Sequence, residues 1–335
     1  MAGVAEGSVI GVDLGGTKLL AGAVDADGTV HHRTNRPARG LSQLELVEMV
    51  VHAVESVRRS VGGEVSAVGF GIPCTFDART GLAVQAVNLP LHDIRFADVM
   101  AERLEVPVVV DNDANCAVLA EARAGAGAGC SEVAMLTIGT GIGGGMVIHG
   151  EVYRGFAGGG AELGHMVVDM DGRPCQGSCP NRGCLESVAS GTALVREVSL
   201  AVARQPDTEI GRAMEGGREL TGPMVTEMAR AGDPVARGAI EVIGRALGVG
   251  LANISNIFCP QVIVIGGGVS AAGELLLAPA REVMRRRALA PGRDDVRIEA
   301  AAFGAEAGMI GAAMLAREWP DDVPSAGGTA AAGAS

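Results

Sequence analysis

The chain has 335 residues, of which 48% are hydrophobic but only 2% are aromatic, and its formal net charge is −12. This length allows two domains, each with a core of Val, Ile, Leu, Ala and Met, as in α/β proteins. The acidic balance argues against a nucleic-acid-binding surface. No segment approaches the roughly 18 apolar residues of a membrane span, and no basic region precedes an apolar signal segment. We therefore expect a cytoplasmic protein with reduced cysteines and without a nucleic-acid or membrane partner.

The first half of the chain reads as strands and one long amphipathic helix. Apolar runs at 9–13 and 19–24 are separated by "DLGGTK", and "DADGT" precedes a third strand at 31–34. Such turns predict antiparallel neighbours. The further predicted elements are a helix at 41–61, a buried strand at 65–73, and a strand within 106–127 that runs into a helix near Ala114.

The second half repeats this opening. Residues 131–150, "SEVAMLTIGTGIGGGMVIHG", again form a strand, a glycine-rich turn and a strand, which suggests an internal structural duplication. The later predicted elements are helices at 234–257, 274–288 and 301–319, and a strand at 261–270. Residues 320–335 are rich in Pro, Gly, Ala and Ser without periodicity, so we expect a disordered tail.

Three glycine-rich segments could bind phosphate through backbone N–H groups. "DLGGTK" (13–18) follows a strand, and Thr17 adds a hydroxyl, although a Gly-Gly-Thr turn alone is more often a plain hairpin. "GTGIGGG" (139–145) is a stronger signal, because so many glycines cost conformational entropy unless something approaches the backbone. "VIGGGVS" (264–270) runs from a strand into a helix and could receive a nucleotide.

One histidine and three cysteines gather in the segment 164–186. The four residues are His165, Cys175, Cys179 and Cys184. Their spacing fits a closed, tetrahedral and therefore structural zinc site. A redox pair and unligated thiols remain alternatives from the residues alone.

Together these motifs resemble the sugar kinases of the ROK family, within the actin-like ATPase (ribonuclease H-like) fold. The resemblance runs from about Ile10 to about Ala316. The motifs that carry it are "GVDLGGTK" (11–18), "VDNDANCAVLAE" (110–121), "TIGTGIGGG" (137–145), "GAELGH" (160–165) with "CPNRGCLE" (179–186), and "IVIGGGVS" (263–270). It implies two α/β domains with mixed sheets flanked by helices and a cleft between the domains. The expected divisions are a small domain 1–115 joined by a helix at about 303–318, and a larger domain 116–302 with a zinc loop at 165–184.

The resemblance also implies roles for individual residues. Asp113 would be the general base, although the local pattern alone equally allows Asp111 or Asp113 to be a helix N-cap. Asp13 would organise Mg²⁺ through water. The expected sugar-binding residues are Asn88, Asn112, Asp113, Glu162, His165 and Glu186. The expected ATP-binding residues are Asp13, Gly15, Gly16, Thr17, Lys18, Gly139, Thr140, Gly141, Gly266, Gly267 and Gly268. The expected structural Zn²⁺ ligands are His165, Cys175, Cys179 and Cys184.

The implied activity is ATP-dependent phosphorylation of a hexose by a homodimer or dimer of dimers. Glucose is favoured as the commonest substrate in the family, while kinases for N-acetylglucosamine, N-acetylmannosamine, mannose and allose share the motifs. Two departures concern Cys74, where the family usually has glycine, and Cys175, which lies two residues before the usual first cysteine position, here Gly177.

Two other functions compete with the kinase. The family's sugar-responsive repressors carry a DNA-binding segment before "DLGGT", whereas twelve residues precede Asp13 here, and the chain is acidic. A catalytically inactive sugar-binding protein is opposed by Asp113 and by both phosphate turns. We therefore expect a hexokinase-type enzyme.

Overall fold

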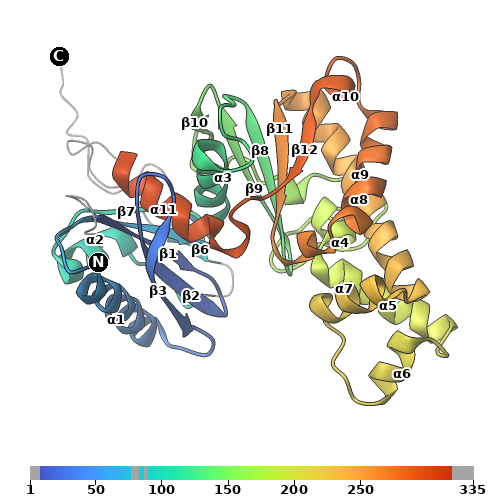
Figure 1. The fold of residues 1–335 in the computed structure, drawn as a ribbon, viewed down its shortest axis with the longest axis horizontal. Coiled ribbons are helices and arrows are strands. Elements are labelled where there is room, and N and C mark those ends of the chain that lie inside the picture. Colours follow the sequence, from blue (N-terminus) through green and yellow to red (C-terminus); the bar gives the residue numbers. More distant parts are fainter. Residues whose placement is uncertain (1–7, 77–82, 87–88, 319–335) are drawn as a thin grey trace. The chain divides into compact units, whose positions relative to one another are not determined.

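The computed structural model describes residues 8–76, 83–86 and 89–318 (Figure 1). The chain divides into two compact units. The first comprises Met1–Gly129, Gly145–Ala161 and Glu306–Ser335, and the second comprises Cys130–Gly144 and Glu162–Ala305. None of the described helices is long and apolar enough to cross a membrane. The expected disordered tail at 320–335 lies outside the described residues.

The first unit is built on a five-stranded sheet with the order β3-β2-β1-β4-β7. Its strands are β1 Ser8–Leu14, β2 Lys18–Val24, β3 Val30–Pro37, β4 Val65–Ile72 and β7 Val108–Asn112. The hairpin β1–β2–β3 is antiparallel, whereas β1, β4 and β7 are parallel. The helices are α1 Gln43–Val61, α2 Phe96–Leu104, α3 Asp113–Ala124 and α11 Ala307–Glu318, and a separate hairpin joins β5 Cys74–Phe76 to β6 Ala83–Ala86.

Alternate residues of β1 face different helices, as the period of a strand requires. Ile10 and Val12 are buried in one core with residues of α1. Gly11 instead faces α11, because a Cβ atom at Gly11 would lie 1.9 Å from the carbonyl oxygen of Met309. Gly69 of β4 meets Ala312 in the same way, at 1.8 Å. The sheet therefore lies between α1 and α11, and glycines let α11 lie directly on the strands (Figure 1).

The other five-stranded sheet has the strand order β10-β9-β8-β11-β12, which matches that of the first. The strands are β8 Val133–Ile138, β9 Ile142–Ile148, β10 Glu151–Val152, β11 Val262–Gly266 and β12 Arg297–Ala300. In both sheets the central strand pairs in parallel with the strand on the side away from its hairpin, β1 with β4 and β8 with β11. Asp13 of β1 pairs with Gly71, and Thr137 of β8 pairs with Gly266. This common order supports the predicted duplication.

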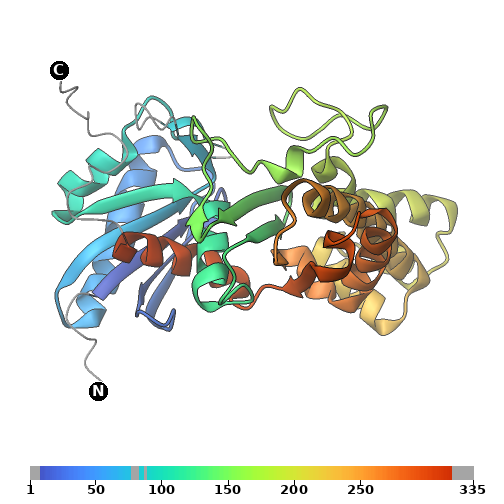
Figure 2. The same ribbon diagram turned by 90° about the horizontal axis from the view of Figure 1, so that it is seen from above.

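Helices make up most of the rest of the second unit. They are α4 Leu185–Ala189, α5 Gly191–Arg204, α6 Glu209–Glu215, α7 Gly222–Ala231, α8 Pro234–Phe258, α9 Glu274–Arg287 and α10 Gly292–Asp295. Asp233 caps α8 by accepting from the N–H of Ala236, with Pro234 at the first position. Residues 166–184 run as an irregular loop, light green in Figure 2, and are closed by the isolated bridges Val167–Cys184 and Pro174–Arg182. The predicted mixed sheets flanked by helices are confirmed.

The division of the chain differs from the expected boundary at 115/116. α3 belongs to the first unit because it packs on α11. Residues 145–161 return to the same unit, since Gly145 approaches the carbonyl oxygen of Ala114 and Arg123 donates to the carbonyl oxygen of Gly150 at 2.9 Å. These contacts between distant parts of the chain have no local sequence signal.

Candidate functional site

Acidic residues of the first unit meet at the carboxyl ends of its parallel strands. In the strand register Asp13 pairs with Gly71, and Gly71 pairs with Asp111. Asn112 ends β7 and Asp113 begins α3. Carboxyl ends of parallel strands are where ligands bind in α/β proteins. Five of the predicted ATP-binding residues, Asp13, Gly15, Gly16, Thr17 and Lys18, lie on the same β1–β2 connection.

The helix cap of α3 is Asn112, and neither aspartate takes this role. The Asn112 side-chain oxygen accepts from the N–H groups of Ala114 at 2.8 Å and Asn115 at 3.3 Å. Among the residues that the structure describes, its amide nitrogen has no hydrogen-bond acceptor, so it can donate to a ligand. The Oδ1 atom of Asp113 lies 2.9 Å from the N–H of Ala114. The capping alternative for Asp111 and Asp113 is therefore wrong, because Asn112 satisfies the exposed N–H groups of the first turn.

Asp111 is buried, accepts three hydrogen bonds and forms an ion pair with Arg154. Its Oδ1 atom accepts from the N–H of Asn112 at 2.7 Å and the Asn115 amide at 2.9 Å. Its Oδ2 atom lies 2.7 Å from both Nε and one terminal nitrogen of Arg154. This carboxylate therefore anchors the segment that carries Asn112 and Asp113. No local pattern around Arg154 indicates this role.

Asp13 has an unusual electrostatic environment. Removal from water, followed by the charge of Asp113, raises the pKa of Asp13 to about 7, while Lys18 opposes the shift. The N-terminal turn of α11 lies against this carboxyl group, since a Cβ atom on Gly308 would be 3.0 Å from its Cγ atom. A carboxylate pair with an unfavourable charge is a typical setting for a divalent cation, which offsets the repulsion.

The second glycine-rich turn, residues Gly139–Ile142, lies at the end of β8 in the second unit. Gly139 donates to the carbonyl oxygen of Gly141 at 2.9 Å. Within the described residues, the N–H groups of Thr140 and Gly141 make no hydrogen bond. Two free N–H groups in a tight turn can hold an anion.

The third glycine-rich segment abuts this turn. Gly267 has φ +82°, and a Cβ atom there would lie 2.5 Å from the carbonyl oxygen of Ile138, the residue before the turn. Only glycine therefore fits at position 267. Gly266 ends β11, and Gly268 begins a short 3-10 helix, Gly268–Ala272. Six of the predicted ATP-binding residues, Gly139, Thr140, Gly141, Gly266, Gly267 and Gly268, thus belong to adjoining segments of the second unit.

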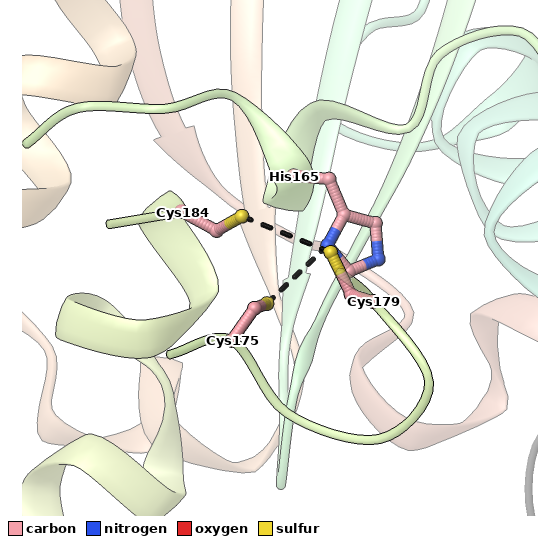
Figure 3. A group of neighbouring side chains, drawn as sticks. All are labelled: His165, Cys175, Cys179 and Cys184. Carbon is pink, nitrogen blue, oxygen red and sulfur yellow. Dashed lines mark hydrogen bonds between the residues drawn. The ribbon is translucent and has the colours of Figure 1, made fainter. Parts of the chain in front are cut away.

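The predicted zinc ligands form a compact cluster (Figure 3). The ligand atoms of His165, Cys175, Cys179 and Cys184 all lie within 4.8 Å of one another. The Cys175 sulfur is 3.5 Å from His165 Nδ1, and the Cys179 and Cys184 sulfurs are 4.0 Å apart. A tetrahedral zinc ion with bonds of about 2.3 Å to sulfur places ligand atoms about 3.8 Å apart. The cluster therefore fits Zn²⁺, and Cys175 takes part despite its displaced position in the sequence.

The predicted sugar-binding residues Glu162 and Glu186 are close to this cluster. Removal from water raises the pKa of Glu162, with His165 lowering it and Glu186 raising it. One oxygen of Glu186 accepts from the N–H of Ile142 at 2.8 Å, and the other lies 3.5 Å from the Cys175 sulfur. Asn88 lies outside the described residues. Cys74 is buried, with 1% of its surface exposed.

Comparisons with known proteins agree on one family. The model of the ROK family matches residues 9–319. The glucokinase of Streptomyces coelicolor is 36% identical over 323 residues, covering 95% of this chain and 99% of the relative. The structure of a ROK family glucokinase from Streptomyces griseus, in complex with glucose and AMPPNP, aligns with a TM-score of 0.84 at 37% identity and covers 93% of this chain and 100% of that one. A ROK family transcriptional regulator, a homologue of the E. coli MLC protein, aligns with a TM-score of 0.82 at 25% identity, over 92% of this chain and 77% of the regulator.

Proposed function

The chain belongs to the ROK family, and we propose that it is an ATP-dependent hexose kinase that converts glucose to glucose 6-phosphate. The observation that carries the proposal is the placement of Asp113 at the junction of β7 and α3, beside Asp13 on the parallel strand β1. The glucokinase relatives and the similarity to a glucokinase bound to glucose and AMPPNP support the same reaction. The actin-like ATPase fold expected from the sequence agrees with these neighbours.

In the proposed mechanism, Asp113 accepts the proton of the attacking sugar hydroxyl. The hydroxyl oxygen forms a bond to the γ-phosphorus of ATP as the bond to the ADP oxygen breaks. Asn112 donates its free amide hydrogens to a neighbouring hydroxyl while its oxygen caps α3. Arg154 and Asp111 keep the Asn112–Asp113 segment in place. The free N–H groups of Thr140 and Gly141 bind phosphate oxygens.

Two metal ions complete the proposal. Mg²⁺ near Asp13 would neutralise charge on the phosphates during transfer. Zn²⁺ held by His165, Cys175, Cys179 and Cys184 would be structural, because four protein ligands leave no open position. It would stabilise the loop that brings Glu162, His165 and Glu186 together for the sugar hydroxyls.

The test is a panel of sugars assayed with Mg-ATP in a coupled assay for ADP. Glucose is expected to give the highest kcat/KM among glucose, mannose, allose, N-acetylglucosamine and N-acetylmannosamine. Failure to phosphorylate any of these sugars would refute the kinase proposal. A different preferred sugar would refute only glucose as the substrate. Polyphosphate in place of ATP tests the donor.

The proposal also includes the oligomeric state and the location expected from the sequence. They are a homodimer or dimer of dimers and a cytoplasmic location. Light scattering of the purified protein tests the first, and fractionation of cells that express the chain tests the second.

A regulatory function is the second candidate, because a ROK transcriptional regulator has a similar fold. The two candidates differ in chemistry. A regulator that only senses the sugar would bind glucose without consuming ATP, whereas the kinase produces ADP in a stoichiometric ratio to the phosphorylated sugar.

A further inference from the structure

The Gly139–Ile142 turn is held in place by the segment that follows the last cysteine. Gly191 donates its N–H to the carbonyl oxygen of Gly139 at 2.8 Å. The hydroxyl of Thr192 donates to the carbonyl oxygen of Thr140, also at 2.8 Å. Glu186 accepts from the N–H of Ile142 at 2.8 Å. The carbonyl oxygens of Gly139 and Thr140 and the N–H of Ile142 are therefore bound within the protein. Of the described turn, the N–H groups of Thr140 and Gly141 are left for an anion.

There is little free space behind this turn. A Cβ atom on Gly141 would lie 2.2 Å from the carboxylate of Glu186, and one on Gly191 would lie 2.6 Å from the carbonyl oxygen of Gly139. A displacement of α4 or of the start of α5 must therefore move the turn. α4 begins directly after Cys184, which is itself buried, and α5 follows α4 after the single residue Ser190.

The cysteine loop reaches the same turn by a second route, through Gln176. Its amide nitrogen lies 3.0 Å from the hydroxyl oxygen of Ser190 and 3.5 Å from the carbonyl oxygen of Thr140. Ser190 caps α5, since its hydroxyl oxygen accepts from the N–H of Ala193 at 3.2 Å. Gln176 directly follows Cys175 in the chain, so it connects the cysteine cluster to the cap of α5 and to the turn.

We propose that the cysteine loop positions the Gly139–Ile142 turn, with Gln176 as a positioning residue, so that metal in the cluster raises the affinity for the nucleotide phosphates. The proposal rests on the proposed function, because the turn's expected ligand is the triphosphate of ATP. Donors that are already fixed bind an anion more tightly than donors that must be ordered on binding. The cluster would then serve the nucleotide as well as the sugar.

The first test compares Gln176→Ala with Arg173→Ala. Arg173 is exposed in the same loop, and within the described residues its side chain makes no hydrogen bond or ion pair. Calorimetry measures the Kd of AMPPNP with Mg²⁺, of adenosine and of glucose, and metal analysis measures zinc. Loss of a hydrogen bond predicts AMPPNP binding weakened about 3- to 10-fold in Gln176→Ala. In Gln176→Ala, the zinc content and the Kd values for adenosine and glucose are expected to stay within about twofold of wild type. In Arg173→Ala, all of these values and the Kd of AMPPNP are expected to stay within the same range.

The second test removes zinc from the wild-type protein with a chelator and restores it. AMPPNP binding is expected to weaken by at least as much as in Gln176→Ala and to recover with zinc, while adenosine binding stays unchanged. Unchanged AMPPNP affinity in both Gln176→Ala and the zinc-free protein would overturn the inference while leaving the kinase proposal intact. A wild-type protein that binds neither AMPPNP nor glucose would overturn both.

Discussion

Gly311 of α11 and Cys116 of α3 bring two helices together backbone to backbone. A Cβ atom on Gly311 would lie 1.7 Å from the carbonyl oxygen of Cys116, a distance that no rotamer change can relieve. α3 begins with Asp113, so the position of the proposed base depends on this packing.

Gly311→Ala is therefore expected to destabilise the protein. Moving α3 and α11 apart opens gaps in the core, and the free energy of unfolding should fall by about 2–4 kcal/mol in denaturant titrations. Gly238→Ala is the matched control, because that glycine lies within α8 with no atom near its Cβ position. The control should instead gain about 0.5–1 kcal/mol. Equal effects of the two substitutions would contradict the described packing.

Asp113→Asn tests the base. The amide keeps the shape of the side chain but cannot accept the sugar proton, so kcat should fall by about 10² to 10⁴-fold. The Kd values for glucose and AMPPNP and the thermal unfolding midpoint should change little. Near-full activity in the folded variant would show that Asp113 is not the base.

Asp13→Asn should change how stability depends on pH. Burial and the charge of Asp113 raise the pKa of this carboxyl group in the folded protein from its ordinary value of 3.8 to about 7. Its contribution is therefore fully favourable below about pH 4 and is lost as the pH rises through 7. The uncharged variant should match wild type near pH 4 and exceed its unfolding free energy at pH 8, by about 4 kcal/mol at most. Denaturant titrations of the metal-free protein across this range measure the difference, and parallel curves would refute the raised pKa.

Arg154→Met should affect both stability and turnover. It leaves the buried Asp111 carboxylate without its cation, at an expected cost of about 1–3 kcal/mol. Since Asp111 anchors the Asn112–Asp113 segment, kcat should fall about 10-fold, with partial recovery in Arg154→Lys. Arg218→Met removes an exposed ion pair with Glu227, which solvent screens, so its free energy of unfolding should match that of wild type. A loss of stability without any loss of kcat would confine Arg154 to a structural role.

Cys179→Ser should release zinc. The remaining His165, Cys175 and Cys184 make an incomplete tetrahedral site, so metal content, thermal stability and glucose affinity should all decrease. Cys259→Ser is the control, since Cys259 is an exposed cysteine outside the cluster. Absence of zinc from purified wild-type protein, measured by mass spectrometry of the metals, would refute the assignment.

Local patterns in the sequence predicted most of the architecture. Glycine-rich turns between apolar runs located β1–β2 and β8–β9, and helical periodicity located α1. The histidine–cysteine spacing predicted a cluster that the structure assembles. These features depend on residues near one another in the chain, so their signals survive in a single sequence.

Contacts between distant residues could not be predicted in this way. Arg154 lies 43 positions from Asp111, and its pairing depends on the return of residues 145–161 to the first unit. Gln176 stands in an irregular loop without periodicity, and nothing local indicates Ser190 as its partner. The first compact unit runs to Gly129 and so extends beyond the expected boundary at residue 115, because α3 packs on α11, and this contact also has no local signal.

The matching strand order of the two sheets allows a comparison of charge at equivalent positions. Asp13 pairs with Gly71 in the first sheet, and Thr137 occupies the same place opposite Gly266 in the second. Equivalent positions thus carry an acidic side chain in one sheet and a neutral side chain in the other. A second carboxylate at position 137 would repel a polyphosphate chain, whereas a hydroxyl tolerates it. On the proposed function, the acidic position would serve a cation and the neutral position would face the phosphates, so one strand arrangement would accommodate ligands of opposite charge.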